Sequence, residues 1–174
     1  ITDITYLKKA ERSLRESEEK YRMIFQNSPV GVIHFDQRGQ VTACNQALGR
    51  IAGTNSEQLL GVFLLDHLKD ATMKAAILDC LRGRVGHYEG YYRSVAEERV
   101  SHIKADYGPM LAEDGTVLGG IGIIEDISDR KRVEREMQDQ LRFLQTLINT
   151  IPNPVFYKDI NGVYFGCNRA FENR

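Results

Sequence analysis

The sequence predicts an α+β fold, in which helices cover one face of an antiparallel sheet and a long helix stands before and after that core in the chain. Two short strand candidates precede a run of short helices, and three longer strand candidates follow, an order typical of α+β domains. Charged stretches rich in Glu, Lys, Arg and Leu flank this core and predict the two long helices. A strand-and-turn phrase also occurs twice, so the same structural unit begins again near the end of the chain.

The two copies of this phrase are offset by 123 residues, from Pro29 to Pro152. They match without a gap at Pro29/Pro152, Val32/Val155, Asp36/Asp159, Gly39/Gly162, Cys44/Cys167, Asn45/Asn168 and Ala47/Ala170, and Asp3-Ile4-Thr5 matches Asp126-Ile127-Ser128 at the same offset. We therefore expect a piece of a longer protein with five parts. These are the exit of a preceding domain (1–5), a helix (6–26), a complete domain (27–128), a second helix (129–150) and the truncated start of a following domain (151–174).

The composition restricts the class of function. A chain of 174 residues with 42% hydrophobic residues and a net charge of -1 is long enough for one folded domain and has no general attraction for nucleic acid. The longest apolar run, 117–124, is far shorter than the ~20 residues of a membrane helix, so we expect no membrane contact in this segment. Three cysteines without a CxxC pair predict small buried residues in a reducing, cytoplasmic setting, with no metal site.

Both long helices carry apolar residues at heptad-like spacing. In 6–26, Leu7, Leu14 and Tyr21 recur every seven residues, but two of the partner positions hold Glu. The stripe of 129–150 is more regular and consists of Val133, Met137, Leu141, Leu144, Ile148 and Ile151. This pattern favours a parallel homodimer through paired flanking helices. The alternatives are a solvated single helix for 6–26 and packing of the second stripe on its own domain.

The core elements follow in order from local signals. Strands at 30–35 and 40–44 enclose a turn at 36–39, and Asn45 is placed to cap the next short helix. Thr54 and Glu57 have the spacing of a capping box for another short helix that ends at Gly61. Residues 70–82 form a longer helix, whose predicted buried face is Met73, Ala76, Ile77, Cys80 and Leu81.

Three more strands are predicted at 86–94, 99–111 and 116–125, the last two joined by a tight turn at Asp114-Gly115. Alternation places Ile103, Ala105 and Tyr107 on one face of the second. In the third, it places Val117, Gly119, Ile121 and Ile123 on one face.

These motifs, in this order, make residues 17–128 resemble a PAS domain of the bacterial signalling type. The resemblance rests on the lead-in helix 18–25, the hairpin with Asp36 and Gly39, Asn45, Leu59-Leu60-Gly61, Glu113-Asp114-Gly115 and the exit triplet Asp126-Ile127-Ser128. It implies a five-stranded antiparallel sheet, a small interior cavity and a sensory role upstream of a histidine kinase or a diguanylate cyclase. The chain departs from the pattern at 94–99, where relatives often have a Lys-Asp-Gly turn, and at His102, near which relatives often have Trp.

Candidate residues for the implied cavity are apolar or amphipathic, as in small-molecule pockets. They are Ile33, Phe35, Phe63, His67, Met73, Ile77, Tyr91, Ile103 and Ile121. Haem-binding relatives have a ligating His where this chain has Met73, with His67 as a nearby alternative. Non-covalent FAD stays open, whereas a photoreactive flavin is excluded because 50–68 contains no Cys. In the alternative, the same side chains close the core and no cofactor or small molecule is held.

No catalytic motif of the hydrolase, metalloprotease or nucleotide-binding type is present, so the segment is expected to be regulatory and not an enzyme. The exit triplet is the predicted signal-coupling joint, where Asp126 caps the outgoing helix or pairs with Arg130. Two functions follow as alternatives. One is a sensor that relays a small-molecule, redox or partner signal, and the other is a ligand-free spacer and dimerisation domain.

Overall fold

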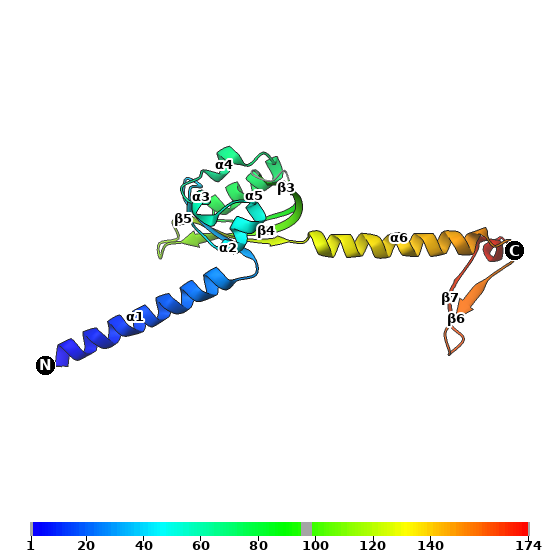
Figure 1. Ribbon diagram of the computed structural model, residues 1–174, viewed down its shortest axis with the longest axis horizontal. Helices are drawn as coiled ribbons and strands as arrows, with labels where there is room; N and C mark the ends of the chain where they lie inside the picture. Colours follow the sequence, from blue (N-terminus) through cyan, green and yellow to red (C-terminus); the bar gives the residue numbers. More distant parts are fainter. Residues whose placement is uncertain (1, 95–98, 174) are drawn as a thin grey trace. The chain divides into compact units, whose positions relative to one another are not determined.

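The computed structural model describes residues 2–94 and 99–173, with side chains described from Leu7 onward (Figure 1). The chain divides into two compact units, Ile1–Ser128 and Asp129–Arg174, each described separately below. The segment 94–99, where this sequence departs from the pattern of PAS domains, lies mostly outside the described ranges. Within those ranges, no helix combines the length and apolar character needed to cross a bilayer.

The first unit contains a five-stranded antiparallel sheet with strand order β2-β1-β5-β4-β3. Its strands are β1 (Gly31–Asp36), β2 (Val41–Cys44), β3 (Gly86–Arg93), β4 (Val100–Leu111) and β5 (Val117–Asp126). The N- and C-terminal strands of the domain therefore meet in the middle, because β1 pairs with β5. This architecture confirms the predicted α+β fold class.

Helices α2 to α5 connect β2 to β3 and cover one face of the sheet (Figure 1). The helices of this unit are α1 (Thr2–Asn27), α2 (Gln46–Ala52), α3 (Ser56–Leu59), α4 (Leu64–His67) and α5 (Ala71–Leu81). The predicted cap of α2 is confirmed, since Asn45 Oδ1 accepts a hydrogen bond from the Leu48 N–H at 3.0 Å. The predicted capping box at Thr54 is wrong. Asn55 caps α3 instead, and the Thr54 hydroxyl bonds to Gln58.

The core lies between the sheet and α5. Of the predicted face of α5, Met73, Ala76, Ile77 and Cys80 are buried and Leu81 is partly buried. Ile103, Ala105 and Tyr107 share the buried face of β4. The expected inner position of Ile121 on β5 is wrong, because Gly120, Gly122 and Ile124 face the core there.

Glycine occupies the inner face of β5 because two aromatic rings need the room. A Cβ on Gly120 would lie 2.5 Å from Cζ of Phe35, and one on Gly122 would lie 2.8 Å from Cδ1 of Tyr107. The Phe35 and Tyr107 rings meet edge to face with centroids 6.3 Å apart, within the range of favourable aromatic pairs. Hydrophobic alternation alone groups Ile121 and Ile123 as a core face and thus selects the wrong side of the strand.

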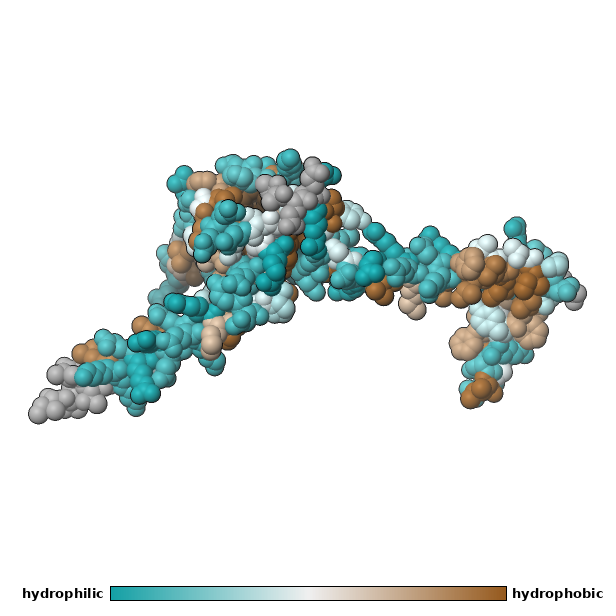
Figure 2. All heavy atoms as spheres, viewed as in Figure 1, coloured by the Kyte–Doolittle hydropathy of each residue, from teal (hydrophilic) through white to brown (hydrophobic). Residues whose placement is uncertain are grey.

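The second unit consists of α6 (Ser128–Thr150), which begins at the last residue of the first unit, followed by a hairpin and a short helix. These are β6 (Phe156–Lys158), β7 (Tyr164–Cys167) and α7 (Arg169–Glu172). The hairpin forms, but its aromatic side chains remain exposed, among them Phe156, Tyr164 and Phe165. Apolar side chains gather at the end of α6 and along this hairpin in Figure 2. An exposed two-stranded hairpin of this kind needs a covering surface for stability.

Candidate functional site: an apolar cavity between two helix joints

A cavity of about 90 Å³ lies between the sheet and the helical layer of the first unit. Its sheet wall is formed by Ile33, Val41, Tyr92, Ile103, Tyr107 and Ile124. Its helical wall includes Leu48 and Ile51 from α2, Leu59 from α3, Leu64 from α4, and Met73 and Ile77 from α5. The wall is therefore hydrocarbon almost throughout, and α3 and α4 are single turns of four residues that form part of it.

Two phenols supply the hydroxyl groups of the cavity wall. Burial raises the pKa of Tyr107 far above its ordinary value, with smaller contributions from Tyr88, Cys80 and Tyr92, and burial also raises the pKa of Tyr92. Both phenols are therefore neutral at physiological pH and can donate a hydrogen bond. Only 4% of Tyr107 is exposed, and its ring lines the cavity.

Four predicted cavity residues, Ile33, Met73, Ile77 and Ile103, lie on the cavity wall. Phe35 is fully buried but belongs to the core beside the wall. Phe63 precedes α4, and the Arg38 guanidinium lies 5.4 Å above its ring. His67 is exposed, with its Nδ1 3.1 Å from the Phe63 carbonyl oxygen, so neither Phe63 nor His67 is placed on the wall.

Tyr91 and Ile121 lie on the opposite face of the sheet, so their predicted place in the cavity is wrong. Tyr91 is 56% exposed, and its ring centroid lies 4.8 Å from that of His102. Tyr92 and Ile124 take their places on the wall. Since neighbouring residues of a strand point to opposite faces, an error of one position reverses the side.

The volume of the cavity decides whether the cofactors considered from the sequence would fit in it. An engineered cavity of about 150 Å³ is enough to bind benzene, so a cavity of 90 Å³ takes a smaller guest. Haem and FAD are far larger than benzene, and the residues present do not fit either group. Met73 packs in the wall as a 3% exposed core residue. Within the described residues, no cluster of His, Cys, Asp and Glu could hold a metal ion.

The cysteines form no disulfide, and two of them are shielded from solvent. Cys44 and Cys80 are buried, as predicted, and burial raises the pKa of both thiols. A thiol kept protonated and inaccessible reacts slowly with oxidants. Cys167, in the hairpin, is partly buried.

The exit joint connects β5 to α6 through the predicted triplet. Asp126 Oδ1 accepts a hydrogen bond from the Ser128 N–H at 3.0 Å, and the Ser128 hydroxyl accepts one from the His102 N–H at 2.9 Å. Ile127 is 2% exposed and donates its N–H to the His102 carbonyl at 2.8 Å. The cationic partner of Asp126 is Arg99, at 3.3 Å, in place of the predicted Arg130.

Opposing effects determine the ionisation of Asp126. Burial alone would raise its pKa, but hydrogen bonds from Ser128 and Ser101 and the charge of Arg99 outweigh burial and lower the pKa below the ordinary 3.8. The carboxylate is therefore ionised at neutral pH and acts as an acceptor in the joint.

The entry joint is built on Asn45, which is 0% exposed. Its side-chain amide donates to the Phe25 carbonyl in the last turn of α1 at 3.0 Å and to the Val30 carbonyl at 2.9 Å. Its side-chain oxygen accepts from the N–H groups of Val32, at 2.9 Å, and Leu48. One side chain thus fastens the end of α1 to β1 and α2. The sequence indicated only the local cap.

Asn168 makes the same set of bonds in the second unit. Its amide donates to the Ile148 carbonyl in the last turn of α6 at 3.3 Å and to the Ile151 and Asn153 carbonyls. Its oxygen accepts from the N–H groups of Val155 and Phe171. The match of Asn45 with Asn168 in the sequence repeat was the signal that could have revealed the long-range role of both residues.

Comparison with known proteins assigns the family. The sequence model of the family described as PAS fold matches residues 25–132. Sporulation kinase E of Bacillus subtilis is 25% identical over 159 residues, which cover 90% of this chain and 21% of the kinase. The sensor protein kinase WalK of Staphylococcus haemolyticus is 20% identical over 135 residues, which cover 76% of this chain and 21% of the kinase. The chain spans about a fifth of the length of these two kinases.

Solved structures share the fold. The PAS domain of BvgS from Bordetella pertussis matches with a TM-score of 0.54 at 20% identity, over 74% of this chain and 98% of that domain. The chain therefore belongs to the PAS family, and its sequence relatives are sensor histidine kinases. Its own fold is that of a regulatory signalling domain.

Proposed function

We propose that this chain is a cytoplasmic sensory and dimerisation module that relays a small-molecule signal to a histidine kinase output. The observation that carries the proposal is the position of the two joints. Asn45 fastens the incoming helix to β1, Asp126 and Ser128 lie where the outgoing helix begins, and β1 and β5 are paired and both line the cavity. A shift in the cavity wall therefore acts directly on both helix attachments.

The kinase output is favoured over the diguanylate cyclase alternative because the sequence relatives named above are histidine kinases. A switch between two arrangements of the joint requires only a few kcal/mol of differential ligand binding. The spacer alternative is less well supported, since a cavity of 90 Å³ lies in the core and two tyrosines line it.

Replacing Asp126 with alanine tests the relay. In the full-length protein, Asp126→Ala should make autophosphorylation independent of the signal, because the carboxylate that fixes the start of α6 is lost. The domain itself should lose only about 1 kcal/mol, the usual cost of a missing cap. The matched control is Asp129→Ala, which removes the same charge from a carboxylate that contacts only Arg132 within α6 among the described contacts. Normal signal regulation in Asp126→Ala would overturn the relay.

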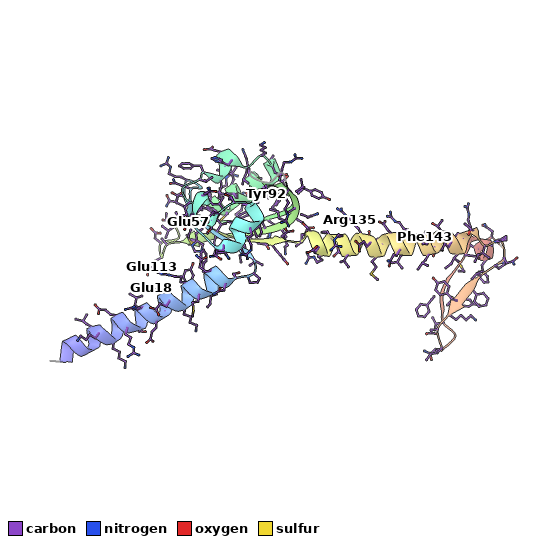
Figure 3. All side chains as sticks on the ribbon, viewed as in Figure 1. Glu18, Glu57, Tyr92, Glu113, Arg135 and Phe143 are labelled. Carbon is purple, nitrogen blue, oxygen red and sulfur yellow. The ribbon has the colours of Figure 1, made fainter. Side chains whose placement is uncertain are left out.

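The proposed dimer is parallel and uses the stripes of the flanking helices. Leu7, Leu14 and Tyr21 on α1, and Val133, Met137, Leu141 and Leu144 on α6, are all more than half exposed. Aligned apolar residues of this kind are stabilised by a second copy of the same helix. Phe143 on α6 is marked in Figure 3.

Introducing charge into the α6 stripe tests the dimer. Leu141→Asp combined with Leu144→Asp should shift the protein toward the monomer, with the dissociation constant raised at least about tenfold, because two carboxylates per chain would face each other in the seam. Sedimentation equilibrium measures the change. Thr146→Asp, on the opposite side of the helix, is the control and should leave the dissociation constant unchanged. A double variant with the mass of the wild type would exclude α6 as the dimer contact.

A further inference from the structure

The size of the cavity, its apolar wall and the two tyrosines in that wall together restrict the chemistry of its guest. We propose that it binds a small, neutral, mainly aliphatic molecule with a single oxygen, and that the Tyr107 hydroxyl donates a hydrogen bond to that oxygen. The inference rests on the proposed sensory function and names the ligand class for it.

Size sets the first limit. Scaling from the benzene-sized cavity of about 150 Å³, a volume of 90 Å³ holds about three to five non-hydrogen atoms. Short ketones, alcohols and aldehydes fall in this range, whereas sugars, nucleotides and amino acids exceed it.

The wall sets the second limit. Thirteen of the fifteen lining residues carry purely apolar side chains, and the two others are tyrosines. An ionised group in such a wall would have no counter-charge, and burying it would cost several kcal/mol. The guest is therefore neutral and has most of its surface as hydrocarbon.

The third limit comes from Tyr107. Tyr107 is 4% exposed and lines the cavity. A guest with an acceptor oxygen can take a hydrogen bond from its hydroxyl, and one such bond contributes about 1 kcal/mol net. The Tyr92 hydroxyl on the same wall is a second donor, and Tyr92 is marked in Figure 3.

The helical wall provides a means of entry. Leu59 and Leu64 lie on α3 and α4, which are single turns of four residues each. Helices this short have little stability of their own and depend on packing. Local opening of α3 and α4 would admit a guest of this size while the sheet stays intact.

Butanone is a suitable probe, with 2-methylbutane as a hydrocarbon of the same number of non-hydrogen atoms. On the full chain, titration followed by methyl NMR should show both probes shifting signals of Ile33, Ile77 and Ile103. Tyr107→Phe should weaken butanone binding about fivefold, the effect of one net hydrogen bond, and leave 2-methylbutane binding unchanged. The control is Tyr91→Phe, which removes a hydroxyl from the adjacent strand and the opposite face and should change neither affinity.

Unchanged butanone binding by Tyr107→Phe, or an equal loss of affinity for both probes, would overturn the role of Tyr107. Failure of both probes to bind would overturn the ligand class. Neither result bears on the relay, which is judged separately by the Asp126→Ala experiment.

Discussion

Asn45→Ala is expected to lower the free energy of unfolding of the first unit by about 4 kcal/mol. The substitution leaves the Phe25 carbonyl and the N–H groups of Val32 and Leu48 without this partner, and the Val30 carbonyl with the Ser28 hydroxyl. Each unpaired group costs about 1–3 kcal/mol when water cannot replace it. Urea unfolding at equilibrium measures the change. Asn45→Asp should be at least as destabilising at neutral pH, because it places a buried carboxylate oxygen against the Phe25 and Val30 carbonyl oxygens.

The sequence repeat supplies the control for this prediction. Asn168→Ala removes the equivalent bonds in the second unit, and we expect it to leave the urea transition of the first unit in place. Amide exchange in the hairpin should become faster in the same variant. A loss below about 1 kcal/mol in Asn45→Ala would show that the polar contacts of this side chain are replaceable by water.

Gly86→Ala is expected to destabilise the first unit by about 3 kcal/mol or more, the range for overpacking at a rigid contact. A Cβ at this position would lie 1.9 Å from the carbonyl oxygen of Ala76 and 2.6 Å from its carbonyl carbon, both in the backbone of α5. Helix α5 would have to move away from β3, and its residues Met73 and Ile77 would move with the cavity wall. Thermal and urea unfolding of the variant measure the loss.

Gly108→Ala is the matched control on the neighbouring strand. Its Cβ would meet only Cγ2 of Ile121 at 3.9 Å, an ordinary contact, and alanine restricts the unfolded chain more than glycine does. We expect stability within about 0.5 kcal/mol of the wild type or slightly above it. Equal stability of the two variants would mean that α5 can shift on the sheet without cost.

Local patterns were sufficient for the elements of this fold. The strand predictions at 30–35 and 86–94 lie within one residue of β1 and β3 at each end, because turn residues and hydrophobic alternation mark both limits. The first long helix is the exception, since α1 begins at Thr2 and the prediction began at residue 6. Asp3, Ile4 and Thr5 therefore lie in the helix. The predicted exit of a preceding domain at 1–5 stays a prediction.

The site was predicted less completely, because the contacts that position its residues join segments that are far apart in the sequence. Which of Tyr91 and Tyr92 faces the cavity depends on the register with β4, where Tyr91 pairs with His102 and Tyr92 with Ser101. The inner face of β5 depends on the rings of Phe35 and Tyr107, which are far away in the chain. The pairing of Asp126 with Arg99 likewise joins the end of β5 to the residue before β4, whereas a local pattern points to Arg130.

The duplicated asparagine has a consequence for how such proteins diversify. The bonds of Asn45 and Asn168 to the preceding helix end on backbone carbonyls, which every sequence possesses. A gene segment that encodes one helix and its domain can therefore be exchanged for another by recombination without redesigning the attachment. The attachment of such a domain to the helix before it therefore does not depend on the side chains of that helix end.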